Sequence, residues 1–174
     1  MILRALLYNL FKKNPGRYAD TRPTDNVDMT QYLGRWYELA RYDTAFEEGL
    51  EEVYTEYKAR PDGSISVNNF GMDKHHHRKE AHAVGTPSGD GQMMVSFVPF
   101  MPFLSTPYNI LAVDEFYRNA LVSNDSGSCL WFLSRSPQPE EESFDALKSE
   151  ALRRGFDLSA LHYTKHRFVP PREA

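Results

Sequence analysis

Three consecutive histidines, His75, His76 and His77, are the residues of this sequence best suited to hold a metal ion. Imidazole nitrogens are common ligands of zinc and other transition metals. Successive side chains along a strand point to opposite faces, so adjacent histidines do not converge on one ion without further ligands such as Asp73 or His82. We therefore interpret the run as a polar hairpin and predict neither a metal site nor a cofactor.

The single cysteine, Cys129, is the candidate nucleophile. Nucleophilic catalysis requires a general base beside the thiol, and no sequence feature places a histidine next to Cys129. Glutamates at positions 47, 48, 51, 52 and 140–142 are interpreted as solvated faces or as charges at a helix start. The sequence also lacks a glycine-rich phosphate-binding loop. These observations predict a protein that is not an enzyme.

The composition predicts a single globular domain and argues against nucleic-acid binding and an internal disulfide. The 174 residues suit one domain, and 41% of them are hydrophobic, which is enough to build a full core. The net charge of −4 argues against a nucleic-acid partner, which would require a basic face. One cysteine excludes an internal disulfide.

From Gln31 onward, short runs of β-forming residues alternate with turn signals about every ten residues. We predict eight strands, at residues 37–42, 53–59, 64–70, 78–85, 92–98, 108–113, 119–123 and 128–134. Three prolines within residues 99–107 exclude a central strand there. Eight consecutive strands with hairpin-length links predict an all-β fold, an antiparallel up-and-down barrel, because closure removes exposed edges.

Residues 137–154 are predicted to form a C-terminal α-helix packed outside the barrel. Glutamates 140–142 lie near its start and basic residues lie toward its end, which suits the helix dipole. An apolar stripe falls at helical spacing, and Gly155 is the expected stop. The stripe consists of Phe144, Leu147, Ala151 and Leu152. A short final strand is expected within residues 161–165.

Two apolar segments have more than one interpretation. Residues 1–13 could be a short amphipathic helix packed on the barrel or partly disordered, a membrane-surface anchor, or a processed signal. Residues 99–107, rich in phenylalanine, could contact the pocket mouth, a membrane or a second subunit. We place an N-terminal apolar segment and linker at residues 1–30 and the barrel domain, with its helix, at residues 31–170.

Three motifs occur in order along the barrel domain. Gly34 and Trp36 lie in the string GRWYELAR, Asp114 and Tyr117 form a turn between two late strands, and Arg135 ends the eighth strand. In these regions, over roughly residues 29–168, the chain resembles the lipocalins, and residues 46–51 and 108–114 resemble the bacterial outer-membrane lipocalin and apolipoprotein D branch. The resemblance implies an eight-stranded lipocalin barrel whose closed end carries Trp36 beneath the guanidinium of Arg135.

The resemblance also implies a function. We expect reversible binding of a small hydrophobic or amphiphilic ligand, a fatty acid or lysophospholipid, with a role in membrane maintenance. Two alternatives are a carrier of a rigid apolar ligand, such as a retinoid, sterol or tetrapyrrole, and an interaction protein with a filled barrel; a homodimer also remains open. The family implies an outer-membrane or periplasmic location, although no cysteine for a lipid anchor follows the apolar segment in this sequence.

Strand alternation predicts which side chains line the ligand cavity. If Trp36 points inward, every second residue shares its face, and a shift of one residue would invert that face. The predicted ligand-binding residues are Glu38, Ala40, Tyr42, Val53, Thr55, Tyr57, Val95, Phe97, Tyr108, Ile110 and Trp131. They combine an apolar wall with a few hydroxyl groups and one carboxylate, which suits a ligand with a long tail and a polar head.

Overall fold

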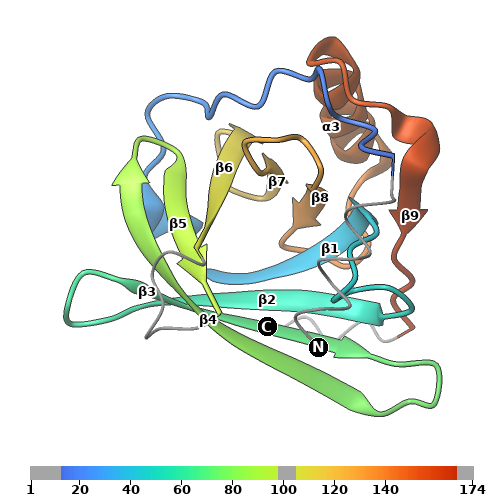
Figure 1. Ribbon diagram of the computed structural model, residues 1–174, viewed down its shortest axis with the longest axis horizontal. Coiled ribbons are helices and arrows are strands. Elements are labelled where there is room, and N and C mark those ends of the chain that lie inside the picture. Colours follow the sequence, from blue (N-terminus) through green and yellow to red (C-terminus); the bar gives the residue numbers. More distant parts are fainter. Residues whose placement is uncertain (1–12, 98–104, 168–174) are drawn as a thin grey trace.

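The computed structural model describes residues 13–97 and 105–167. Eight strands follow one another as antiparallel neighbours, and β1 pairs with both β2 and β8, so the sheet closes into a barrel (Figure 1). They are β1 (Gly34–Tyr42), β2 (Glu51–Ala59), β3 (Ile65–Met72), β4 (Arg78–Gly89), β5 (Gln92–Ser96), β6 (Thr106–Val113), β7 (Asn119–Ser123) and β8 (Leu130–Ser134). The predicted barrel is confirmed.

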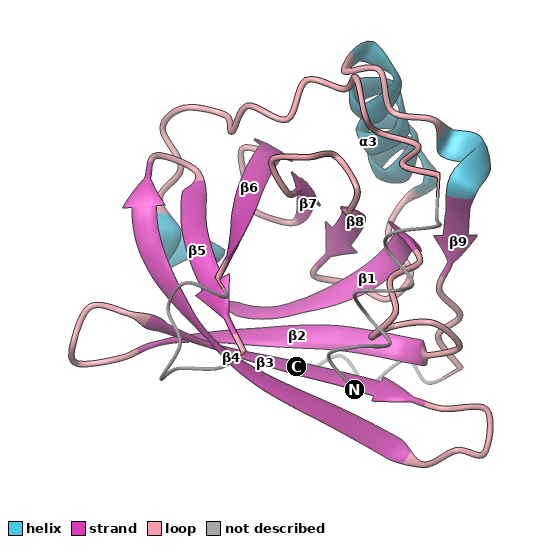
Figure 2. Ribbon diagram, in the orientation of Figure 1, coloured by secondary structure: helices cyan, strands magenta, loops and turns pink. Residues whose placement is uncertain are grey.

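In the part of the chain that the structure describes, helical segments and a ninth strand accompany the barrel. These are α2 (Met29–Tyr32) before the barrel, α3 (Glu141–Arg153) after it, a 3-10 helix (Leu158–Ala160) and β9 (Leu161–Tyr163), which pairs with β1. Figure 2 shows α3 on the outside of the barrel, as predicted. The helix begins later than expected because Pro137 and Pro139 hold the preceding chain extended, with Glu140 at ψ 140° as its N-cap.

Two prolines lie within strands, at positions outside the strand ranges predicted from the sequence. β6 starts at Thr106 and therefore includes Pro107, and β4 runs past its expected end at Gly85, through Pro87, to Gly89. Both prolines lie near strand ends, where a missing N–H is tolerated. The prediction that prolines exclude a strand over the whole of residues 99–107 is thus wrong at the last two positions.

Within residues 13–97 and 105–167, the buried apolar side chains form two separate cores. The first lines the barrel interior; the second lies between the outer wall of the barrel and α3. The interior core comprises Tyr32, Trp36, Tyr57, Ile65, Val67, Ala83, Met93, Val95, Ile110, Ala120, Val122 and Leu133. The outer core comprises Leu39, Ala40, Tyr42, Leu111, Leu121, Leu130, Phe132, Leu147, Ala151 and Phe156.

One end of the barrel, the closed end, is sealed by α2, Trp36 and Arg135. The Arg135 guanidinium lies 3.9 Å from the Trp36 ring centroid, as expected, and its N–H groups donate to the backbone carbonyls of Leu33, Arg35 and others. Gly34 has φ +99°, and a Cβ there would approach Arg135 Nη1 to 3.1 Å, so glycine fits both the backbone and the contact.

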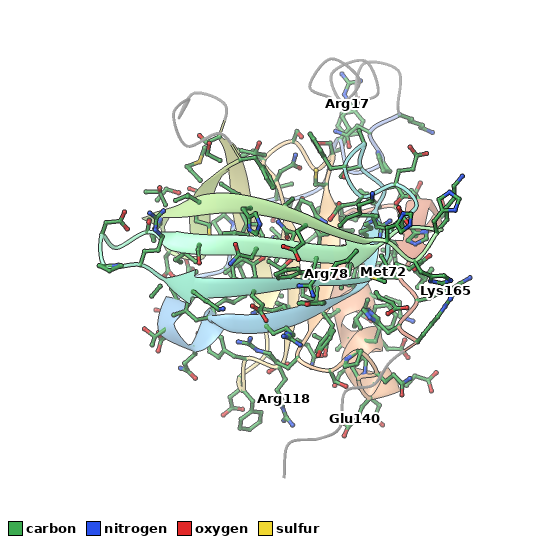
Figure 3. The ribbon with its side chains drawn as sticks, turned by 90° about the horizontal axis from the view of Figure 1, so that it is seen from below. Arg17, Met72, Arg78, Arg118, Glu140 and Lys165 are labelled. Atoms are coloured by element: carbon green, nitrogen blue, oxygen red, sulfur yellow. The ribbon has the colours of Figure 1, made fainter. Side chains whose placement is uncertain are left out.

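The opposite end, the loop end, is formed by loops at residues 43–50, 73–77 and 124–129. In Figure 3, Arg118 and Glu140 lie on the side of the molecule opposite Arg17. No helix within residues 13–97 and 105–167 is long and apolar enough to cross a membrane. The predictions for residues 1–13 and 99–107 fall almost wholly outside the described residues.

Candidate ligand-binding site

A bulge in β1 changes which side chains enter the barrel. Pairing between β1 and β8 shifts between Glu38 and Ala40, so Leu39 and Ala40 both face the outer core. Beyond the bulge the alternation is inverted: Arg41, not Ala40 or Tyr42, pairs with Trp131 and faces inward. The predicted inward placement of Ala40 and Tyr42 is therefore wrong.

Tyr42 illustrates what the outer face of β1 does instead. Its ring packs against Phe156, with centroids 6.2 Å apart, and its hydroxyl donates to the Asp157 carbonyl 3.0 Å away. Both partners come from the segment that follows α3. Ala40 and Tyr42 thus attach the C-terminal segment to the barrel and do not line the interior.

Most of the other predicted residues do lie on the inner face. On β2, Tyr57 pairs with Gly34 and Thr55 with Trp36, which places Val53, Thr55 and Tyr57 inside. Val95 and Ile110 belong to the interior core, and Tyr108 and Trp131 are partly buried against it. The structure thus brings these side chains together around the barrel interior; their contact with a ligand remains a prediction.

Phe97 lies at the rim and is half exposed, which distinguishes it from the other predicted residues. Its ring is 55% exposed and stacks on Phe46, which is 62% exposed, with centroids 6.3 Å apart and planes 9° apart. Phe46 belongs to the loop between β1 and β2, and Phe97 follows β5. Two segments distant in sequence thus place a pair of aromatic rings at the loop end.

Three tyrosine hydroxyl groups meet inside the barrel. Tyr108 Oη lies 2.7 Å from Tyr32 Oη and 2.8 Å from Tyr57 Oη. Burial raises the pKa of all three phenols above the ordinary value. The cluster therefore stays uncharged at neutral pH and presents hydroxyl groups already satisfied by one another.

Arg41 is fully buried on the inner face of β1 and ties the loop at residues 43–50 to the barrel. Its Nη1 donates to Glu38 Oε1 at 2.6 Å and to Thr164 Oγ1 at 3.2 Å. Its Nε donates to Asp43 Oδ1, and its Nη2 donates to the carbonyls of residues 47 and 50. A guanidinium has five N–H donors, and these five bonds match that number.

Glu47, in this loop, points its carboxyl group toward the interior. Trp131 Nε1 donates to both carboxyl oxygens, at 3.1 and 3.2 Å, and Thr44 Oγ1 donates to Oε2 at 3.0 Å. Burial, followed by the nearby charge of Glu38, raises the pKa of Glu47 to about 8, although Arg41 acts in the opposite direction. The interpretation of Glu47 as a solvated glutamate is wrong.

Arg41 and Glu47 are the polar residues of the interior that sequence reasoning missed. One signal was available: Glu38 and Arg41 are charged residues three apart in a strand with an otherwise buried pattern. A pair of opposite charges at that spacing would face the same side only if a bulge lay between them, because strand alternation has a period of two.

The residues considered for metal binding and catalysis lie elsewhere. His75, His76 and His77 occupy the loop between β3 and β4, not a strand, and Asp73 Oδ1 accepts the backbone N–H groups of His75 and His77. Among the described residues, no cluster of side chains has the arrangement of a metal site. Cys129 precedes β8, and its backbone N–H donates to Asn124 Oδ1.

The turn motif between β6 and β7 has a structural role. Asp114 Oδ1 accepts the backbone N–H groups of Phe116 and Arg118, both at 3.0 Å. Tyr117 takes φ 53° in this turn, and its hydroxyl accepts the Asp28 N–H at 2.7 Å, next to the start of α2. Asp114 and Tyr117 thus position the closed end.

The sequence profile of the lipocalin-like domain family matches residues 27–166, which include the whole barrel. The chain is a lipocalin. It is 40% identical to the outer membrane lipoprotein Blc of Citrobacter freundii over 146 residues, covering 81% of this chain and 80% of that protein. It is 33% identical to temperature-induced lipocalin-1 of Arabidopsis thaliana over 154 residues, covering 83% and 82% of the two chains.

More distant relatives agree with this assignment. Apolipoprotein D of Mus musculus is 29% identical over 157 residues, with 84% of this lipocalin and 80% of that protein covered. The crystal structure of apocrustacyanin C1 superposes with a TM-score of 0.71 at 16% identity, covering 90% and 92% of the chains. Lipocalins bind small hydrophobic ligands and are in general not enzymes, so the barrel interior is the candidate ligand site.

Proposed function

We propose that this lipocalin reversibly binds a single-chain lipid, a fatty acid or lysophospholipid, inside its barrel and catalyses no reaction. The observation that carries the proposal is the uneven distribution of polar groups along the interior. Near Trp36 the interior side chains are apolar or aromatic, and the hydroxyl groups of the three tyrosines bond one another. Arg41, Glu47 and the Trp131 Nε1 lie toward the loop end. This distribution suits an acyl chain directed inward and a head group directed outward.

The relatives support the same class of ligand. Two of the similar proteins are named as an outer membrane lipoprotein and as an apolipoprotein, names that associate those proteins with lipid. The exposed Phe46 and Phe97 rings at the loop end would meet a lipid on its way into the barrel. We propose a role in membrane maintenance on this basis.

A fluorescence titration tests the proposal. The uncharged probe N-phenyl-1-naphthylamine is expected to bind saturably, and hexadecanoic acid and 16:0 lysophosphatidylcholine are expected to displace it competitively. Affinity should fall as the acyl chain is shortened, because each buried methylene contributes about 0.8 kcal/mol. Absence of saturable binding to delipidated, folded protein would favour an interaction protein with a filled barrel. Visible-light absorbance of the purified protein would favour a rigid chromophoric ligand.

Neighbouring positions on β5 provide a matched pair of variants. Val95 belongs to the interior core. Met94, the residue before it on the same strand, points to the opposite face and is only partly buried. Val95→Phe should weaken probe binding because it occupies interior volume, and Met94→Phe should leave binding unchanged. Equal effects of the two substitutions would place the probe outside the barrel.

A further inference from the structure

The described interior offers no unoccupied cation to receive a ligand's negative charge. All five Arg41 donors are engaged, and its charge is opposed by Glu38 at 2.6 Å and Asp43 at 2.8 Å. Lys79 pairs with Gly71 across β3 and β4, but its side chain is more than half exposed, and its Nζ lies 3.3 Å from Asp73 Oδ2. Arg135 closes the other end with its donors on backbone carbonyls.

Glu47 is the ionisable group placed to meet a head group. Its carboxyl is held against the Trp131 indole, whose ring stacks 6.5 Å from that of Tyr108 on the inner wall. The buried Arg41 holds the loop that carries Glu47, because Arg41 Nη2 donates to the Glu47 backbone carbonyl at 2.6 Å. Glu47 Oε2 accepts from both Trp131 and Thr44, whereas Oε1 accepts only from Trp131 and keeps a lone pair for a ligand.

We propose that Glu47 contacts the polar head of the bound lipid, and that it makes the barrel prefer a single-chain lipid with a hydroxyl-bearing, uncharged head to an ionised fatty acid. This inference rests on the proposed function and deepens it. A hydroxyl group donates to a carboxylate or accepts from a carboxylic acid, so it suits Glu47 in either protonation state. An ionised fatty acid meets a like charge unless one proton is shared by the two carboxyl groups.

Proton binding by Glu47 would then be coupled to lipid binding. The titratable groups around Glu47 are Glu38 and Arg41 on β1, Asp43 on its own loop, Tyr57 on β2 and Tyr108 on β6. The phenols remain uncharged, and Arg41 is neutralised by its carboxylate partners. Glu47 therefore sets how binding of an anionic head depends on pH above neutrality, where the fatty acid itself is already ionised.

Two ligands with the same acyl chain test this inference: dodecanoic acid and 1-monododecanoylglycerol, each displacing N-phenyl-1-naphthylamine at pH 6.5 and pH 9. For the wild-type protein, we expect the affinity for the acid to fall about tenfold over this range, since binding then requires uptake of one proton. The affinity for the monoacylglycerol should change less than about twofold. At pH 9 the monoacylglycerol should be the tighter ligand.

Glu47→Gln and Glu48→Gln form the matched pair of variants, because Glu48 is exposed on the same loop. Glutamine keeps an oxygen for the Trp131 N–H, and a thermal melt of each variant reports whether the fold is kept. Glu47→Gln should abolish the pH dependence for the acid, and Glu48→Gln should retain it. A pH dependence that survives Glu47→Gln, or equal behaviour of the two lipids, overturns the inference while leaving lipid binding intact. If neither lipid nor 16:0 lysophosphatidylcholine displaces the probe, the proposed function fails as well.

Discussion

Arg135 stabilises the closed end of the barrel through both its charge and its hydrogen bonds. Its guanidinium covers Trp36 and donates to backbone carbonyls from the approach to β1 and from the turn before β7. Arg135→Ala would remove the cation–π contact and leave these carbonyls without a donor. We expect the free energy of unfolding in urea to fall by about 2–4 kcal/mol.

Arg118 supplies the control for this experiment. It lies in the same part of the molecule and also covers an aromatic ring, Phe116, at 4.8 Å, but both side chains are exposed. Arg118→Ala should change the free energy of unfolding by less than about 0.5 kcal/mol. Similar losses for both substitutions would show that Arg135 has no special role at the closed end.

The tyrosine cluster gives a second prediction at the residue scale. Tyr108→Phe would remove the hydroxyl that joins Tyr32 and Tyr57 and would leave two buried hydroxyl groups short of a partner. We expect a loss of about 1–3 kcal/mol in the free energy of unfolding, measured by urea denaturation. Tyr18→Phe, at a side chain that is 88% exposed, is the control. An unchanged Tyr108→Phe protein would indicate that water replaces the missing hydroxyl.

Individual interior residues were only partly predictable from the sequence. Alternation identified Thr55, Tyr57 and Ile110, because their strands keep a period of two through those positions. It failed at Arg41 because the bulge at Leu39 carries no glycine or proline to mark it. It failed at Glu47 because a loop glutamate looks solvated until the contact with Trp131, 84 residues away, is known.

At the scale of elements, α3 stabilises the barrel from outside the ligand site. Leu147 is buried in the outer core, whereas Leu152 on the same helix is 58% exposed. Leu147→Ala should lower the free energy of unfolding by about 2–4 kcal/mol through the cavity it leaves. Leu152→Ala should cost less than about 1 kcal/mol, because Leu152 is exposed and leaves no cavity. It is a matched control, since both substitutions change helix propensity equally.

The same pair of variants separates stability from binding. Because Leu147 packs on the outer wall, the affinity of Leu147→Ala for N-phenyl-1-naphthylamine should equal that of the wild-type protein at temperatures where both are folded. A weakened affinity would show that α3 shapes the interior as well as supporting it.

The sequence predicts which strands and helices form better than it predicts the residues at which they begin and end. The eight strands and the helix follow from alternation, turn residues and an apolar stripe, which are local signals. Some of their ends depend on contacts with distant segments: β1 starts at Gly34, where it pairs with Tyr57 of β2. The start of α3 depends instead on local prolines, because Glu140 caps the helix only after Pro137 and Pro139. A single sequence carries no direct record of such pairings.

The stability of the whole molecule depends on pH through two kinds of carboxyl group with opposite effects: aspartates at turns, whose pKa values are lowered, and Glu47, whose pKa is raised. Asp73 accepts backbone N–H groups of its hairpin, and these hydrogen bonds lower its pKa to about 2. Asp28 and Asp157, which cap short helices, also have lowered pKa values through hydrogen bonds. Groups with a lowered pKa add stability above their unfolded pKa, and this stability is lost as the pH falls through the folded value.

Glu47 has the opposite sign, because its folded pKa is raised from an ordinary 4.5 to about 8. Its contribution to stability is complete below about pH 4.5 and is lost as the pH rises toward 8, where the folded protein must give up a proton from a shielded site. Glu47→Gln should therefore lose less stability than the wild-type protein between pH 5 and pH 9, by roughly 1–3 kcal/mol, since partial exposure reduces the full effect. Urea denaturation at both pH values measures the difference. Glu48→Gln should follow the wild-type profile, and a Glu47→Gln profile parallel to wild type would mean that Glu47 ionises as a solvated glutamate does.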